Sequence, residues 1–129
     1  MSKREGFADE WFVKGDHDFE TAQLLADKGG YADAICFHVH QALEKYLKGF
    51  LVHNNIGPKR IHDLEELIKA CADVDEEFLK FIDTCSDITR YYFECRYPFA
   101  ADDYSLDEAA KALDSAKEII GFVKEKIKD

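Results

Sequence analysis

Apolar side chains recur at helical spacing along most of the chain, and they are densest between residues 31 and 52. Within that segment they form a broad arc, the pattern of a helix that is buried against several neighbours. The segment is therefore predicted to be a central helix that ends near His53, before the turn residues 54–58. The arc consists of Ala34, Ile35, Phe37, Val39, Ala42, Leu43, Tyr46, Leu47, Phe50 and Leu51.

Four further segments repeat this spacing. A helix over residues 8–27 is expected to stop at the glycine pair 29–30, and a short helix is expected over residues 62–72. A fourth helix begins near Asp75 and must end before Pro98. A fifth begins at Ser105, whose Ser-x-x-Glu pattern is typical of a capping box, and runs to the C-terminus. The sequence predicts one all-α domain over residues 1–129, an up-and-down antiparallel helical bundle of four long helices plus one short helix.

A line of polar residues runs through the apolar arc of the central helix. His38, Gln41, Lys45 and Lys48 are three, four and three residues apart, so they share one helix face. Ammonium groups suit phosphate, and an amide and an imidazole can donate hydrogen bonds beside them. Alternatively, the lysines extend into solvent while the histidine and the glutamine satisfy buried backbone groups. The spacing leaves both interpretations open.

A basic and aromatic segment closes the predicted fourth helix, where the chain reads RYYFECRYP. Arg90 and Arg96 could bind phosphate with two hydrogen bonds each, and Tyr97 could stack on a base. Alternatively, the arginines pair with Asp87 and Glu94, and the tyrosines pack in the core. These alternatives stay open at the level of sequence.

Two smaller motifs contain histidine. His62 beside Asp63 is placed to cap the short helix, and the basic pair at residues 59–60 makes anion binding at that helix N-terminus a second interpretation. His40 and Glu44 are one helical turn apart, but two ligands do not make a metal site. We therefore predict neither a metal site nor a cofactor.

Composition narrows the class of protein. The chain has 129 residues, of which 47% are hydrophobic, and no apolar run reaches the roughly 18 residues that a membrane span needs. The N-terminus lacks the apolar core of a secretory signal, which predicts a cytoplasmic protein without membrane partners. The formal net charge of −10 argues against nonspecific coating of nucleic acid but permits a local basic pocket. The four dispersed cysteines, without a CxxC pair, are typical of reduced, buried thiols.

Four segments taken together resemble the HEPN domain, the nucleotide-binding helical domain of higher eukaryotes and prokaryotes. They occur in the family's order and cover residues 11 to about 98. The matching motifs are Trp11 with Gly15-x-x-Asp18-Phe19-x-x-Ala22, then Phe37-x-x-His40-Gln41-Ala42-Leu43-Glu44-Lys45-x-Leu47-Lys48, then His62-Asp63-Leu64, and finally Tyr92-x-x-x-Arg96-Tyr97-Pro98.

This resemblance implies a bundle that usually forms a homodimer and associates with an ATP-like or AMP-like nucleotide or with RNA. It also implies a minimal nucleotidyltransferase as partner, in a two-component system of the toxin–antitoxin kind. Ribonuclease members of the family carry Arg, four to six residues and then His. In this chain the corresponding positions after Arg90 are residues 95–97, and those after Arg96 are residues 101–103, and none is histidine.

We therefore predict a noncatalytic binding member of the family. Its predicted phosphate- and base-binding residues are Lys45, Lys48, Arg90, Arg96 and Tyr97, supported or joined across a dimer seam by His38, His40, Gln41 and His62. One alternative is a weak metal-independent ribonuclease whose base is His38, His40 or His62. The other is a purely structural interaction subunit.

Overall fold

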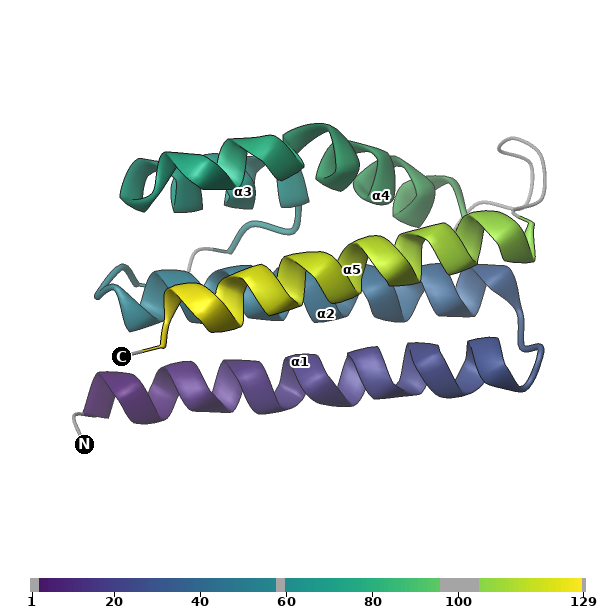
Figure 1. Cartoon of the computed structure of the whole chain (residues 1–129), viewed down its shortest axis with the longest axis horizontal. Helices are drawn as coiled ribbons and strands as arrows, with labels where there is room; N and C mark the ends of the chain where they lie inside the picture. Colours follow the sequence, from purple (N-terminus) through teal and green to yellow (C-terminus); the bar gives the residue numbers. More distant parts are fainter. Residues whose placement is uncertain (1–2, 58–59, 96–104, 129) are drawn as a thin grey trace.

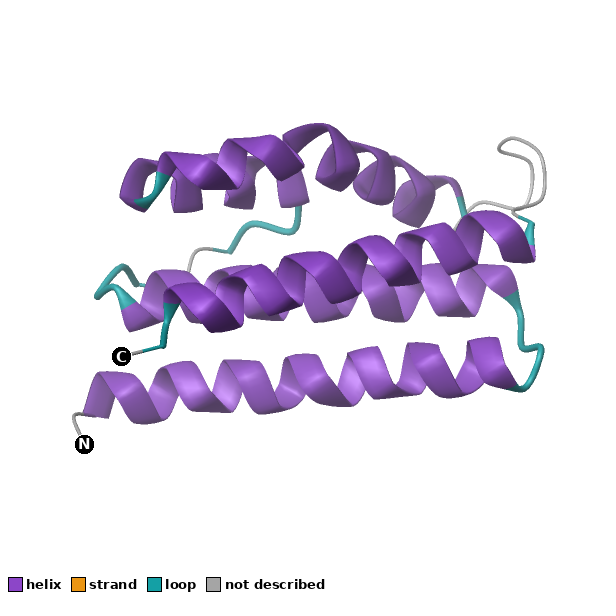
Figure 2. Cartoon of the chain, viewed as in Figure 1, coloured by secondary structure: helices purple, strands orange, loops and turns teal. Residues whose placement is uncertain are grey.

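The described part of the chain folds into a series of helices. The computed structural model describes residues 3–57, 60–95 and 105–128. Figure 1 and Figure 2 show helices and loops over these ranges, without a strand among them. The predicted all-α fold is confirmed. The helices are α1 (Lys3–Asp27), α2 (Ala32–His53), α3 (Leu64–Val74), the 3₁₀ helix η1 (Glu76–Phe81), α4 (Ile82–Glu94) and α5 (Leu106–Lys126).

The central element is α2, which packs against α1, α3, α4 and α5. In Figure 1, α1 and α2 run antiparallel, α5 lies in front of α2, and α3, η1 and α4 form an upper layer. Because α2 has neighbours on most sides, the greater part of its apolar arc is buried. Phe37 departs from the prediction, since it is 41% exposed. The described part of the core centres on Ile35, Val39, Leu43, Tyr46, Leu47, Leu51, Leu64, Leu67, Ile68, Phe78 and Ile119.

Side-chain caps define the starts of α3 and α5. The Asp63 carboxylate accepts a backbone hydrogen bond at 2.9 Å from the second residue of α3, which confirms a cap at this turn. Because Asp63 is itself extended, α3 begins at Leu64 rather than at His62. The Ser105 hydroxyl accepts a backbone hydrogen bond at 3.1 Å at the start of α5, as the capping-box pattern predicts.

The first helix is longer than its apolar pattern predicts. It begins at Lys3 rather than at Ala8, and it ends at Asp27 as expected. Gly29 follows with φ 70°, a left-handed conformation that glycine adopts without steric cost. The glycine pair therefore stops the helix for the predicted reason.

The predicted fourth helix is divided into two kinds of helix. Asp75 is extended, with φ −147°, and its side chain accepts a hydrogen bond at 3.0 Å from the backbone N of Glu77. The next turns are 3₁₀, a geometry that places residues three apart on one side. Phe78 and Phe81 are three apart and both are buried, so this geometry brings both rings into the core. Regular α-helix begins only at Ile82.

Two glycines allow α1 and α2 to lie close together. A Cβ atom at Gly15 would lie 2.7 Å from Tyr46 Cδ2, and one at Gly49 would lie 2.5 Å from Phe12 Cε1. The Tyr46 hydroxyl also donates a hydrogen bond to the Asp16 carboxylate. These contacts set the register of the two helices and bring polar residues of α1 within reach of the polar face of α2.

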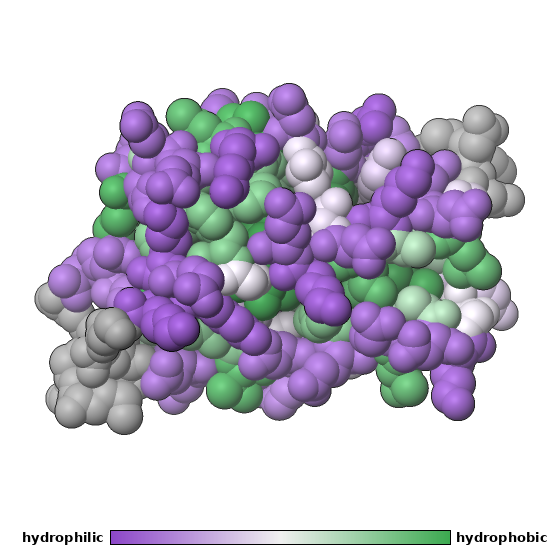
Figure 3. Space-filling model, in the orientation of Figure 1, coloured by the Kyte–Doolittle hydropathy of each residue, from purple (hydrophilic) through white to green (hydrophobic). Residues whose placement is uncertain are grey.

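The surface is mostly hydrophilic, with separate apolar areas, on the face shown in Figure 3. Among the described residues, none of the helices combines the length and the apolar character that crossing a bilayer requires. One aromatic group reaches the surface between α2 and α4. Phe37 and Phe93, 41% and 45% exposed, each contact Tyr92, with ring centroids 5.8 Å and 5.5 Å from it.

Candidate functional site

Two carboxylates contact three of the four residues in the predicted polar line of α2. Asp18 of α1 contacts both His38 and Lys45, which are two helical turns apart on α2. His38 Nδ1 lies 3.0 Å from Asp18 Oδ1, and the Lys45 ammonium donates to Asp18 Oδ2. Because a carboxylate only accepts, His38 Nδ1 carries the proton in this contact. Lys45 keeps 27% of its side chain exposed, so it remains accessible to a ligand.

The second carboxylate, Glu44, lies inside the bundle. The Lys48 ammonium donates to Glu44 Oε2 at 3.0 Å, and the two residues are 5% and 7% exposed. His62 Nδ1 lies 3.3 Å from both Glu44 oxygens. The Lys48 ammonium also lies over the Trp11 ring, 5.7 Å from its centroid. Lys48 therefore does not extend into solvent, and its charge is balanced within the bundle.

His40 is fully buried beside this ion pair. Its ring stacks on Tyr92 with centroids 3.9 Å apart and an interplanar angle of 12°. His40 Nδ1 lies 4.0 Å from Glu44 Oε1, and neither ring nitrogen makes a hydrogen bond within the described part of the chain. Burial lowers the pKa of His40 below its usual value, and the Glu44 carboxylate opposes that effect. The ring is therefore neutral at pH 7.

Two further predicted site residues, Gln41 and Arg90, lie in the described part of the chain. Gln41 is half-buried on α2, one turn before Lys45. Arg90 is exposed on α4, where it pairs with Asp87 at 3.5 Å and lies 5.1 Å from the centroid of the Tyr91 ring. The local ion pair with Asp87 is thus formed. Arg96 and Tyr97 lie outside the described residues.

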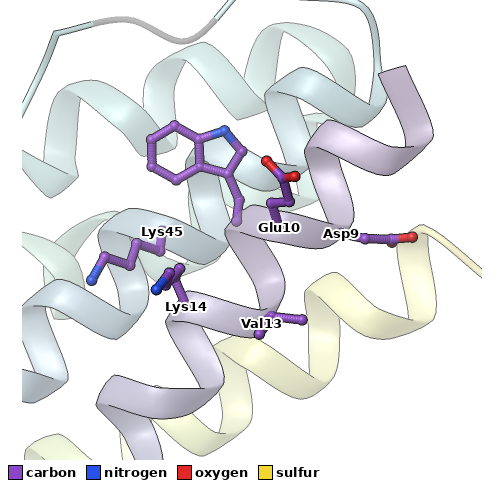
Figure 4. Close-up of a pocket in the computed structure, with 6 residues that line it drawn as sticks. Asp9, Glu10, Val13, Lys14 and Lys45 are labelled. Atoms are coloured by element: carbon purple, nitrogen blue, oxygen red, sulfur yellow. The ribbon is translucent and has the colours of Figure 1, made fainter. Parts of the chain in front are cut away.

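A hollow of about 630 Å³ opens where the first half of α1 meets α2. Figure 4 shows the ammonium groups of Lys14 and Lys45 on one side of α1, with the Asp9 carboxylate pointing away from them. Lys45 thus belongs to a concave surface together with an indole ring and a second lysine. The hollow is lined by Asp9, Glu10, Trp11, Val13, Lys14 and Lys45.

Trp11 and Lys14 line this hollow, although the sequence pattern alone does not indicate that either belongs to a site. Their spacing of three residues was visible and places them on neighbouring parts of one helix face. The missing information was which face of α1 meets Lys45. That pairing depends on the close approach of the two helices at Gly15 and Gly49, which is a tertiary contact.

A second hollow, of about 310 Å³, lies at the other end of the polar line. It brings His38 together with the exposed aromatic ring of Phe37 and with Tyr92 of α4. Within the described ranges, His, Cys, Asp and Glu side chains form no group of three or more that could hold a metal ion. The contacts seen on these surfaces are cation–anion pairs, hydrogen bonds and ring stacking.

The fold and these polar contacts define an all-α bundle organised around one helix with a buried ion pair. The family model of the HEPN domain matches residues 8–126, and the chain belongs to this family. The crystal structure of TT1696 from Thermus thermophilus is similar, with 31% sequence identity and a TM-score of 0.77, over 92% of this chain and 97% of that one. The comparison with curated proteins gave no match.

A second solved structure supports the fold. ST0689, described as an archaeal HEPN homologue, aligns with a TM-score of 0.75 at 24% sequence identity. The alignment covers 94% of this chain and 98% of that chain. Both comparisons extend over nearly the full bundle, so the likeness concerns the arrangement of all the helices rather than a single motif.

Proposed function

We propose that this protein is a noncatalytic, nucleotide-binding HEPN subunit that forms a homodimer and pairs with a minimal nucleotidyltransferase, in a two-component system of the toxin–antitoxin kind. The observation that carries the proposal is the position of Lys45, a predicted phosphate ligand, in a hollow beside an indole ring. An ammonium group next to an aromatic ring offers one contact for a phosphate and one for a base. The net charge of −10 favours such a local site over nonspecific binding of long nucleic acids.

The noncatalytic part of the proposal is supported by the neutral state of His40 and by its stacking on Tyr92. A fully buried ring under another ring is poorly placed to exchange protons with a substrate. The segment after Arg90 also lacks a histidine at the ribonuclease spacing. We therefore assign His40 and Tyr92 to the support of the bundle rather than to catalysis.

The dimeric part is supported by the aromatic group at Phe37, Tyr92 and Phe93. Two of its rings are more than 40% exposed, on a face that also carries a hollow. Exposed apolar groups next to polar residues are typical of protein–protein contacts. Sedimentation that finds only monomer at micromolar concentration would contradict this part of the proposal.

The nucleotide part is tested by calorimetry with ATP and AMP. We expect measurable heat with the natural protein and a weaker affinity in Lys45→Gln. Lys117→Gln is a matched control, because Lys117 is an exposed lysine of α5 outside the hollow. Absence of heat with either nucleotide at millimolar concentration would remove small nucleotides as ligands. Gel filtration with the product of the neighbouring gene tests the nucleotidyltransferase partner separately.

A specific contact favours one second candidate, a metal-independent ribonuclease that uses His62. Its side chain is 72% exposed, and its Nδ1 lies 3.3 Å from both oxygens of the buried Glu44 carboxylate. A carboxylate that holds one ring nitrogen leaves the other free for general acid–base work.

Incubation of the purified protein with tRNA and mRNA in EDTA tests this candidate. Cleavage that is lost in His62→Ala but kept in His17→Ala, an exposed histidine of α1, would support it. Intact RNA, or cleavage that His62→Ala leaves unchanged, would exclude this histidine as the base.

A further inference from the structure

The hollow at α1 contains the indole ring of Trp11, which the buried Lys48 contacts from inside the bundle. Trp11 is the single tryptophan of the chain and is half-buried. The buried Lys48 ammonium lies over its ring at 5.7 Å from the centroid, and Lys48 is itself held by Glu44. The indole is therefore supported on one face by an ordered ion pair. A planar ligand would stack on the face that Lys48 does not cover.

The charges around this platform favour a ligand of limited negative charge. Lys14 and Lys45 direct their ammonium groups to the same side, but Lys45 already shares its charge with Asp18. Asp9 and Glu10 line the same hollow. One phosphate can be neutralised by the two lysines, whereas a triphosphate brings more negative charge than these two ammonium groups can balance, into a hollow that already contains two carboxylates.

The size of the hollow fits a nucleotide. A volume of about 630 Å³ lies within the roughly 300–1,000 Å³ range of small-molecule sites. The carboxylates of Asp9 and Glu10 add hydrogen-bond acceptors, which can receive the hydroxyl groups of a ribose or the amino group of a base.

We propose that this hollow is a nucleoside monophosphate site, in which the base stacks on Trp11 and the phosphate contacts Lys14 and Lys45. This inference rests on the proposed nucleotide-binding function and names its site and its ligand class. The same reasoning gives an order of affinity. AMP binds more tightly than ATP, because the carboxylates in the hollow repel the extra phosphate charges. AMP also binds more tightly than adenosine, because adenosine has no phosphate for the lysines to contact.

The test uses the fluorescence of Trp11 together with calorimetry, since this residue is the chain's own reporter. The purified protein is titrated with AMP, ATP and adenosine. We expect AMP to change the tryptophan emission and to bind at least about fivefold more tightly than the other two. Lys14→Gln should weaken AMP binding by about fivefold or more, while Lys117→Gln on α5 should leave it unchanged.

Two further variants separate the roles of the ring and of the carboxylates. Trp11→Phe keeps a smaller ring over Lys48 and should weaken AMP binding, which calorimetry measures in the absence of tryptophan. The double variant Asp9→Asn/Glu10→Gln should reduce the preference for AMP over ATP. Circular dichroism verifies that each variant keeps its helices.

The outcomes distinguish this site from the general function. AMP binding that leaves the Trp11 emission and the Lys14→Gln affinity unchanged would overturn the assigned site while nucleotide binding elsewhere stands. Tighter binding of ATP, weakened by Lys14→Gln, would overturn the monophosphate preference. If neither nucleotide binds, both this inference and the nucleotide part of the proposed function fail.

Discussion

Lys48 donates a hydrogen bond to Glu44 at 3.0 Å across one turn of α2, with both side chains buried in the bundle. The pair is supported by His62 on the carboxylate side and by Trp11 on the ammonium side. Charges removed from water are tolerated only when they are paired and hydrogen-bonded. The pair therefore links the position of α1 to that of the turn before α3.

Removal of the Glu44 carboxylate should be strongly destabilising. In Glu44→Ala the Lys48 ammonium remains buried without its partner, so we expect the free energy of unfolding to fall by about 3–5 kcal/mol. The double variant Glu44→Leu/Lys48→Met removes both charges and should recover most of that loss. Urea denaturation followed by circular dichroism measures all three proteins. Equal losses in the single and the double variant would show that charge burial is not the cause.

Two glycine-to-alanine changes should have opposite effects. At Gly49 the new Cβ would lie 2.5 Å from Phe12 Cε1, so Gly49→Ala should lower stability by about 1–3 kcal/mol. Gly121 lies in α5, and a Cβ there meets no atom within 4 Å. Gly121→Ala should therefore raise stability by up to about 1 kcal/mol, through helix propensity alone. Thermal denaturation measures the stability of the two variants. If Gly121→Ala were as destabilising as Gly49→Ala, the close approach of α1 and α2 at Gly49 would not be the cause of the loss.

Acid should destabilise the protein partly through His40. Burial lowers its pKa in the folded state. At pH values between the folded and the unfolded pKa, the unfolded chain therefore binds a proton at His40 that the folded chain does not bind. The contribution of His40 is complete above its unfolded pKa of about 6.5 and is lost as pH falls toward the lowered folded pKa. One such group changes stability by at most about 1.4 kcal/mol per pH unit.

The matched variant for this prediction is His40→Phe, which keeps a ring against Tyr92 and removes the titration. Urea denaturation at pH 7.5, 6.5 and 5.5 gives the slope of stability against pH for each protein. We expect the variant to have the shallower slope. Identical slopes would mean that other groups account for the acid sensitivity.

The cysteines should react slowly and in a fixed order. All four are free thiols. Burial raises the pKa of Cys36, Cys71 and Cys85 to about 12, and that of the half-buried Cys95 to about 11. Because the thiolate is the reactive form, a disulfide reagent at pH 8 should modify Cys95 first and the other three only after unfolding in guanidinium. Cys95→Ser should remove the early phase, and rapid reaction of more than one thiol would contradict the burial of the core cysteines.

The local features of the fold were accessible from the sequence because they depend on neighbouring residues. The apolar spacing of α2 identified the central helix, and Ser105 and Gly29 marked helix ends through their own backbone and side-chain chemistry. The 3₁₀ start at Glu76 was missed. Its cause is the fit of Phe78 and Phe81 into the core, and local pattern carries no information about that fit.

In the candidate site, too, some features follow from local sequence and others from tertiary packing. Spacing placed Lys45 and Lys48 on one face of a helix, and that is where they lie. It could not show that Lys48 would be buried against Glu44 while Lys45 would reach Asp18 of another helix. Nor could it place Trp11 and Lys14 beside Lys45, because that contact depends on the approach of α1 to α2.

The sequence by itself thus determined the helices, their caps and the residues able to carry a charge or a ring, since these follow from interactions within a few residues along the chain. Only the tertiary structure decided which of those charges are neutralised inside and which face a hollow. The physical reason is that burial and ion pairing depend on the distance between side chains from different helices. That distance is set by the packing of the whole bundle.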